Sequence, residues 1–98
     1  MESIFGVQWR QFIPSLRSGA FTDPFLVRET SPGEKEEWYL YAKSATTLVQ
    51  VMTLIHTRRA WRTVDGALRD LEREIGKLPT ITVYGSIEAC AADFGSDG

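Results

Sequence analysis

The chain has little of what enzymes and metalloproteins use for their chemistry. Its 98 residues include a single histidine and a single cysteine, which excludes an internal disulfide framework and a metal site with several His or Cys ligands. The sequence contains no GxGxxG fingerprint, no Walker-type phosphate loop and no HExxH motif. We therefore expect a protein that is not an enzyme and that holds neither a metal nor another cofactor.

His56 and Cys90 form the one conceivable pair of a base and a nucleophile. They lie on separate predicted elements, and the sequence shows no third group that would orient the histidine. An isolated cysteine in an apolar helix is usually a small packing residue. We interpret His56 as a strand-edge residue and Cys90 as a residue of a short helix.

Charge of one sign and long apolar runs are also scarce. The formal net charge is −2, whereas a dedicated nucleic-acid-binding domain usually carries a basic excess. The longest apolar-rich run, LVQVMTLI, is too short to span a bilayer. The first residues, MESIFGVQWRQF, lack the basic start of a secretory signal. These features predict a soluble cytoplasmic protein without a membrane partner.

What the chain has is an ordinary globular composition, with 43% apolar and 24% charged residues, and a length that suits one modest core. We predict a single domain over residues 1–98. Residues 1–24 are expected to form a segment of helix and loop, residues 25–84 the sheet and main helix, and residues 85–98 a short helix and a frayed tail.

The N-terminal segment carries apolar residues at helical spacing. Four of them are four, three and four residues apart, which is the period of one helix face: Phe5, Trp9, Phe12 and Leu16. Pro14 interrupts this pattern because it lacks an N–H and its ring clashes with the preceding turn, so we predict a short helix that ends near Phe12. The aromatic side chains either cover one side of the core or leave Trp9 and Phe12 exposed as a docking segment.

The central part of the chain has the patterns of strands. FLVRET and EWYLYAKS flank the loop SPGEKE, as in a β-hairpin. Residues 47–57 fit either a helix or a strand. Their β-branched members alternate strictly, which favours a strand, and both faces are largely apolar, which predicts a central position in the sheet.

A helix with clear limits follows these strands. Thr63 is a good N-cap, and Gly76 is a natural residue just beyond the C-terminus. The apolar stripe between them repeats at spacings of four, three and four: Val64, Leu68, Leu71 and Ile75. After the helix, TITVYG predicts a short strand, and SIEACAADF predicts a short helix capped by Ser86.

Basic residues are concentrated around this helix. On the helix itself, arginines can pair with Asp65 and Asp70 three or four residues away. Three arginines before the helix have no acid within four residues except Asp65, and they flank a tryptophan. Unpaired arginines beside an aromatic ring are typical of binding sites. We therefore predict that partner binding centres on Arg58, Arg59, Trp61 and Arg62.

Two other interpretations of this stretch stay open. Trp61 can point into the core while the arginines only solubilise a strand end, since buried tryptophans are common. In that case Trp9 and Phe12 are the next candidates for partner binding. Taken together, the elements predict an α+β fold: a small antiparallel sheet with one main helix packed on it and short helices at the termini.

Residues 54–83 resemble the core of the ParC-like partition-associated proteins of bacterial plasmids. In that family a strand leads through basic residues and an aromatic residue into a Ser/Thr-x-Asp-x-Ala-Leu helix, which is followed by a glycine and a closing strand. The matching positions here are Arg59, Trp61, Arg62, Thr63, Asp65, Ala67, Leu68, Leu71, Gly76, Ile81 and Val83. Gly66 and the apolar run before Arg58 depart from the pattern. The resemblance implies a non-enzymatic accessory factor of a mobile genetic element.

We therefore expect an interaction protein, an accessory factor of a plasmid or phage that binds a protein or nucleoprotein partner. Two alternatives remain open: a small inhibitor of a bacterial defence complex of the anti-CRISPR kind, and a direct nucleic-acid-binding protein that uses the arginine patch. The acidic net charge favours a protein or nucleoprotein partner over direct binding of nucleic acid. A strand-rich chain with a limited core also predicts a homodimer.

Overall fold

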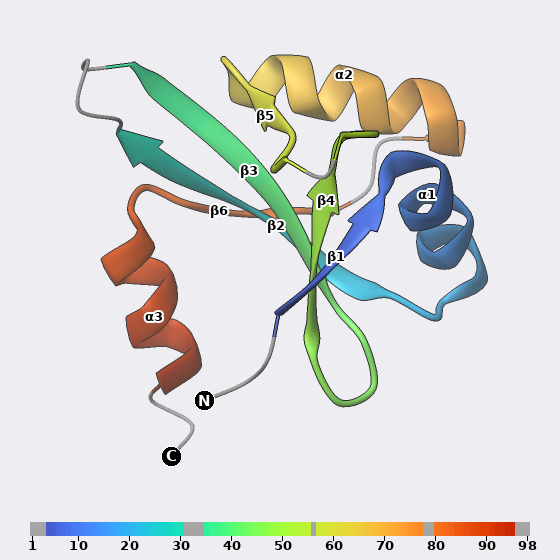
Figure 1. The fold of residues 1–98 in the computed structure, drawn as a ribbon, viewed down its shortest axis with the longest axis horizontal. Coiled ribbons are helices and arrows are strands. Elements are labelled where there is room, and N and C mark those ends of the chain that lie inside the picture. The colour runs from blue at the N-terminus through green and yellow to red at the C-terminus, as the bar shows by residue number, and fades with distance from the viewer. Residues whose placement is uncertain (1–3, 31–34, 56, 78–79, 96–98) are drawn as a thin grey trace.

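The computed structural model describes residues 4–30, 35–55, 57–77 and 80–95. Its elements, in chain order, are β1 (Ile4–Gln8), α1 (Trp9–Ser18), β2 (Thr22–Thr30), β3 (Glu36–Lys43), β4 (Leu48–Met52), β5 (Ala60–Trp61), α2 (Val64–Ile75), β6 (Thr82–Tyr84) and α3 (Ile87–Gly95). The strands form one sheet in the order β1-β4-β3-β2-β6, and the short β5 pairs with β3 beside this path (Figure 1).

The sheet is mixed, which corrects the predicted antiparallel fold class. β1 runs parallel to β4, and β6 runs parallel to β2. The helices α1, α2 and α3 have 10, 12 and 9 residues, so α2 is not one main helix among short ones. Sequence patterns reveal pairing between neighbours in the chain, as in a hairpin, but not the parallel pairing of strands that lie far apart in sequence.

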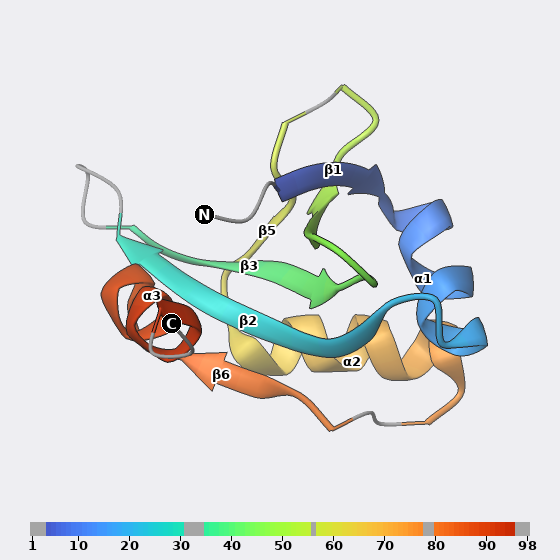
Figure 2. The same ribbon diagram turned by 90° about the horizontal axis from the view of Figure 1, so that it is seen from below.

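The sheet carries a core on each face. α1 and α2 cover one face, and the largest fully buried side chains of that core are Phe12, Leu26, Leu40, Leu71 and Val51. α3 packs against the other face at β2 and β6, where Phe25, Val27 and Tyr41 form a second buried cluster (Figure 2). Along β3 the side chains alternate between the clusters, with Leu40 and Ala42 in the first and Tyr41 in the second.

Helix α1 differs from its prediction at both ends. Phe5, which the helical spacing included, belongs to β1, and the helix continues past Pro14 instead of ending near Phe12. Pro14 is exposed, so its ring displaces no core side chain. Burial of Phe12 and Ile13 in the core offsets the backbone hydrogen bond that a proline removes.

The hairpin of β2 and β3 and the central strand β4 confirm the strand predictions, but β4 is shorter than expected. It lies between β1 and β3 and ends at Met52. The Thr53 N–H donates to the Thr57 carbonyl over 2.7 Å, and the two hydroxyl oxygens are also 2.7 Å apart. These bonds close a turn at residues 53–57, where the prediction extended the strand. His56, the predicted strand-edge residue, lies outside the described residues.

Helix α2 confirms the predicted cap at each end. The Thr63 hydroxyl accepts a hydrogen bond from the Gly66 N–H over 2.9 Å, which satisfies one of the free donors of the first turn. Gly76 has a φ of 92°, a left-handed conformation that ends helices and that glycine adopts without strain.

The C-terminal strand and helix are also as predicted. β6 joins the sheet, and the Ser86 hydroxyl caps α3 by accepting from the Ala89 N–H over 3.1 Å. The end of the predicted frayed tail, residues 96–98, lies outside the described residues.

Within the ranges that the structure describes, none of the helices combines the length and the apolar character needed to cross a membrane.

Candidate functional site

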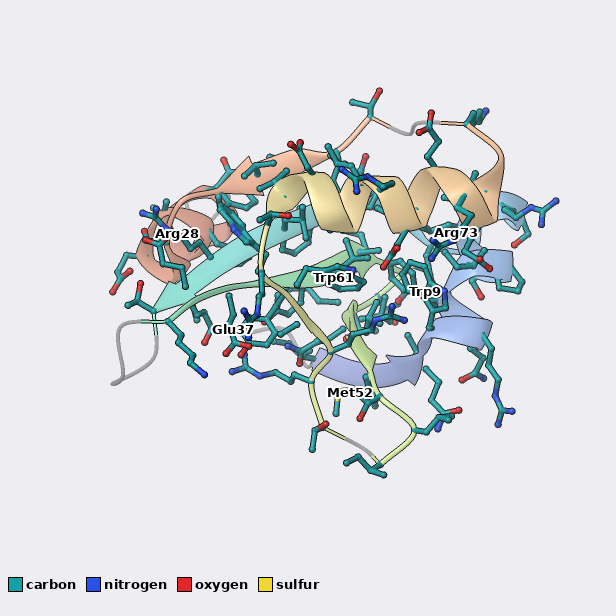
Figure 3. The ribbon with its side chains drawn as sticks, turned by 90° about the horizontal axis from the view of Figure 1, so that it is seen from above. Trp9, Arg28, Glu37, Met52, Trp61 and Arg73 are labelled. Carbon is teal, nitrogen blue, oxygen red and sulfur yellow. The ribbon has the colours of Figure 1, made fainter. Side chains whose placement is uncertain are left out.

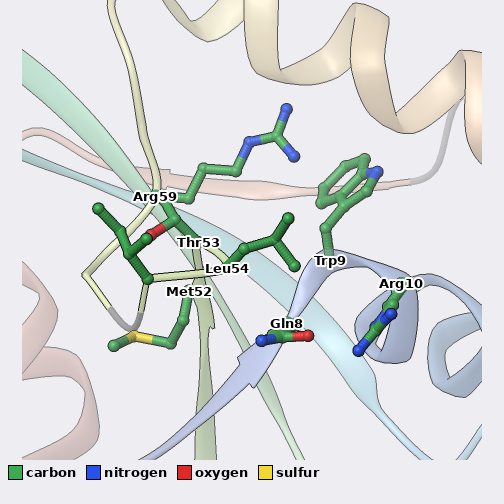
Figure 4. A pocket seen from close by; sticks show the side chains of 8 residues that line it. Gln8, Trp9, Arg10, Met52, Thr53, Leu54 and Arg59 are labelled. Carbon is green, nitrogen blue, oxygen red and sulfur yellow. The ribbon is translucent and has the colours of Figure 1, made fainter.

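A cleft of about 680 Å³ opens between the start of α1 and the turn that follows β4 (Figure 4). The parallel pairing of β1 with β4 creates it, because Gln8 lies opposite Met52 and both strands end at the same level. The chain enters α1 directly after Gln8 and the 53–57 turn directly after Met52. The cleft is lined by Gln8, Trp9, Arg10, Met52, Thr53, Leu54, Ile55 and Arg59.

Arg59 lies against two tryptophan rings at the inner side of the cleft. Its guanidinium carbon is 4.6 Å from the ring centroid of Trp9 and 4.8 Å from that of Trp61. The two rings are themselves 5.7 Å apart and tilted by 55°, and Figure 3 shows them side by side near α2. Such cation–π contacts hold an arginine in a defined orientation. The Arg59 backbone N–H also donates to the Val51 carbonyl over 3.0 Å, which ties the residue to β4.

The carboxylate of Asp70 connects this arginine to helix α2. It accepts a hydrogen bond from Arg59 over 3.3 Å and from the Trp61 indole N–H over 2.9 Å. Arg73 contributes a third bond over 2.9 Å, in the pairing that the sequence predicts for these two helix residues. The other predicted helix pair, Asp65 with Arg69, is not among the ion pairs of the described residues.

The cleft combines apolar side chains with positive charge. Leu54 and Ile55 at its rim are exposed, and Met52 is half-buried beside them. Among the described residues that line it, Arg10 and Arg59 are charged and none carries a carboxylate. Asp70 compensates the charge of Arg59, whereas Arg10 forms no ion pair with the described residues. The hollow thus sets the positive charge of Arg10 beside apolar side chains, which suits a ligand that carries both carboxylates and apolar groups.

Arg58 points to the other face of the sheet and takes part in a separate network. It forms a two-pronged ion pair with Glu29 over 2.7 and 3.2 Å, and its guanidinium lies 4.0 Å from the Tyr39 ring centroid. These bonds to Glu29 raise the pKa of Arg58 above its ordinary value. Nearby, the buried Gln50 donates to the Tyr41 hydroxyl over 2.9 Å, and burial raises the pKa of Tyr41.

The structure thus brings together some of the predicted site residues and separates others. Trp9, Arg59 and Trp61 meet at the cleft, although Trp61 is buried and contributes its ring from within the core. Phe12 is fully buried and does not reach the surface. Arg62 is exposed and forms no ion pair with the described part of the chain.

The premise that the arginines before α2 lack acidic partners is wrong for two of the three. Arg58 pairs with Glu29, 29 residues away in sequence, and Arg59 pairs with Asp70, 11 residues away. The sequence argument considered only acids within four residues, which is the distance that matters on a helix. Neither Arg58 nor Arg59 lies on a helix, so their partners come from elements that the fold brings close.

Of the residues that line the cleft, sequence reasoning named only Trp9 and Arg59. Arg10, Leu54 and Ile55 are among those that it missed. The prediction placed Leu54 and Ile55 in a strand at the centre of the sheet, where apolar side chains are expected to be buried. It therefore gave them no role in binding. The β-branched alternation gave no sign of the turn, because it continues through Thr53 and Thr57, whose side chains close it. Arg10 directly follows Trp9 in the sequence. The N-terminal segment thus also contains an arginine next to a tryptophan, the combination that led to the prediction of the patch around Trp61.

Cys90 does not have the environment of a reactive thiol. It is half-buried on α3 against the second core, and this burial, together with the nearby Asp93, raises the pKa of the thiol, which disfavours the nucleophilic thiolate. His56, the other member of that conceivable pair, is outside the described residues. In the described ranges, no three His, Cys, Asp or Glu side chains converge as metal ligands would.

Comparison of the chain with protein-family models, with curated proteins and with solved structures finds no match. The resemblance to the ParC-like proteins therefore rests only on the residues quoted above. The function must be argued from the cleft itself.

Proposed function

We propose that this chain is a non-enzymatic interaction protein that binds a protein partner through the cleft between α1 and the 53–57 turn. The preferred partner presents a segment in which carboxylates stand beside large apolar side chains. Its carboxylates pair with Arg10, and its apolar side chains pack against Trp9 and the Leu54-Ile55 rim.

The composition of the cleft is the observation that carries this proposal. Two arginines and a tryptophan line it together with Met52 and the exposed Leu54 and Ile55, and none of the described lining residues carries a carboxylate. Tryptophan and arginine are the side chains most enriched at the energetic centres of interfaces. Trp9 and Arg59 are also held in place by their mutual contact and by Asp70, so little conformational freedom is lost on binding.

Direct binding of nucleic acid through the arginine patch is less well supported. Arg58 and Arg59 already have carboxylate partners, so phosphates would have to compete with Glu29 and Asp70. The aliphatic rim of the cleft also offers nothing to a phosphate backbone. The resemblance to plasmid partition proteins would make a protein-binding module of this kind an accessory factor of a mobile element, and an inhibitor of a defence complex would use the same surface.

Selection from a random peptide library displayed on phage tests the proposal. We expect the wild-type protein to enrich peptides in which Asp or Glu lies next to Leu, Ile, Phe or Trp. Arg10→Glu should abolish this enrichment, because it reverses the charge of an exposed residue at the cleft. Arg17→Glu is the matched control, since Arg17 is an exposed arginine of the same helix that does not line the cleft.

Two outcomes would count against the proposal. Enrichment of peptides without acidic residues would remove the electrostatic part of the argument. Equal loss of binding in Arg10→Glu and Arg17→Glu would show that general charge, and not the cleft, attracts the peptides. Titration of the protein with a generic DNA duplex at low salt serves as the counter-test, since steeply salt-dependent binding there would favour a nucleic-acid partner.

A further inference from the structure

The outer edge of β1 is open. β1 is the last strand on its side of the sheet and pairs only with β4 among the described strands. An exposed strand edge is a template for another chain, and proteins usually protect it with charged residues, proline or a bulge. β1 has the sequence IFGVQ, which contains no charged residue and no proline, and its pairing with β4 is regular over its whole length.

Exposed apolar side chains lie at both ends of this edge. Ile4 and Phe5, at the start of β1, are 52% and 58% exposed. Leu54 and Ile55 are 72% and 79% exposed, and they lie just beyond the other end of β1, because the turn follows Met52, the register partner of Gln8. Both views place β1 and this turn along the same border of the sheet (Figures 1 and 2).

We propose that β1 pairs with β1 of a second copy of this chain, antiparallel and about a two-fold axis near Gly6. The antiparallel arrangement sets Ile4 of each copy opposite Gln8 of the other. The Leu54-Ile55 pair of each copy then packs against Ile4 and Phe5 of the other, so that the two apolar ends cover each other reciprocally. A two-fold contact requires such a self-complementary surface. A parallel pairing would bring like ends together instead.

The chemistry of the edge also favours a second copy. Since β1 carries no charge, two copies meet there without like-charge repulsion, although the whole chain is acidic. The opposite edge of the sheet is a poorer candidate. β6 has only three residues. Its apolar residues Val83 and nearby Ile87 are 44% and 53% exposed. Among the described residues, no second exposed apolar pair lies at this edge to contact Val83 and Ile87 of another copy.

The interface is small, because it consists of one five-residue strand and four side chains on each copy. Interfaces at the low end of the size range form weak, reversible complexes. We therefore expect a monomer–dimer equilibrium in the micromolar range, with a single continuous sheet across the dimer. This dimer does not depend on the proposed partner of the cleft, although the Leu54-Ile55 rim is common to both.

Sedimentation equilibrium of the purified chain, from micromolar to millimolar concentration, tests the dimer. The wild type should pass from monomer to dimer, and the double change Ile4→Lys with Phe5→Lys should weaken association at least tenfold. The matched control changes Val83 and Ile87 to lysine at the opposite edge, where exposed apolar residues are replaced in the same way and the dimer should persist. Each variant is compared only if its thermal melting is that of a folded protein.

Mixing two charged variants tests the antiparallel geometry. One carries Ile4→Lys and Phe5→Lys, and the other carries Leu54→Glu and Ile55→Glu. Each alone should be monomeric, whereas an equimolar mixture should dimerise, because lysines of one copy meet glutamates of the other at one junction and the native residues meet at the other. A wild type that stays monomeric at every concentration overturns the proposal, and so does a mixture that does not associate. Because no partner is added, failure here leaves the proposed function of the cleft unaffected.

Discussion

The indole nitrogen of Trp61 donates a hydrogen bond to the Asp70 carboxylate over 2.9 Å, which joins β5 to α2 behind the cleft. The same carboxylate holds Arg59 in its position against Trp9. One acidic residue on the helix therefore fixes both the buried tryptophan and the charged side chain at the inner side of the cleft. This arrangement makes Asp70 a residue that positions the cleft without lining it.

Replacement of Asp70 should destabilise the fold and disturb the cleft. Asp70→Ala leaves the Trp61 indole N–H and the Arg59 guanidinium without their acceptor, and we expect a loss on the order of 1–3 kcal/mol in the free energy of unfolding. Chemical denaturation monitored by tryptophan fluorescence measures it. Glu72→Ala, an exposed acid on the same helix, is the control and should change stability by less than about 0.5 kcal/mol. Equal effects of the two changes would contradict the role of Asp70.

The stripe of α2 should contribute unequally to stability. The sequence places Leu68 and Leu71 in the same stripe, but Leu71 is fully buried in the first core while Leu68 is half-buried. Leu71→Ala should cost on the order of 2–5 kcal/mol, as expected for a cavity in a core. Leu68→Ala should cost roughly 1–2 kcal/mol, since less apolar surface is lost from the interior. Thermal and urea unfolding of both variants decide this, and a larger loss at Leu68 would mean that the helix is rotated.

Gly6 should resist replacement by alanine because of Met52. A Cβ at Gly6 would lie 2.6 Å from the Met52 Cγ, so the methionine must move aside, and overpacking of this kind costs about 1–3 kcal/mol. The penalty should shrink when Gly6→Ala is made in a Met52→Ala background. A double-mutant cycle on the free energy of unfolding measures this coupling. Purely additive effects would show that the two residues do not compete for the same space.

Much of the secondary structure can be predicted from short sequence patterns, whereas the residues that line the cleft cannot. The Thr63 hydroxyl and Gly76 mark the ends of α2 in the sequence as they do in the structure, and the two runs around residues 31–34 form the expected hairpin. The parallel pairing of β1 with β4 has no such mark, because it joins Ile4 to Leu48, residues that are far apart in the sequence. Without that pairing, a sequence cannot show that Arg10 and Leu54 line one cleft.

Tyrosine ionisation should weaken the contact between β6 and α3 at high pH. The Tyr84 hydroxyl donates to the Asp93 carboxylate, and this bond, with some burial, raises the pKa of Tyr84 from 10.0 to about 12. Because the folded state holds this proton more tightly than the unfolded chain, the stabilisation is complete below pH 10 and is lost as the pH rises towards 12.

Absorbance titration of the tyrosines, compared between the wild type and Tyr84→Phe, checks this expectation. The variant should lack the most alkaline ionisation step and should show a shallower loss of stability across the same pH range. Burial also raises the pKa of Tyr39 and Tyr41, so these residues supply the steps that remain. If the absorbance that the variant loses belongs to an early ionisation step near pH 10 and not to the most alkaline one, Tyr84 does not hold its proton through Asp93.

The central claim is that the cleft beside Trp9 receives an acidic, apolar protein segment. Its most direct test follows the indole N–H signals of Trp9 and Trp38 in a ¹H–¹⁵N spectrum while a selected acidic-apolar peptide is titrated in, with each signal assigned by a Trp→Phe variant. Trp9 lines the cleft and Trp38, on β3, does not. We predict that the Trp9 signal shifts in a saturable manner while that of Trp38 stays in place, and that Arg10→Glu abolishes the shift. A Trp9 signal that remains unmoved when the peptide is fully bound would contradict the account.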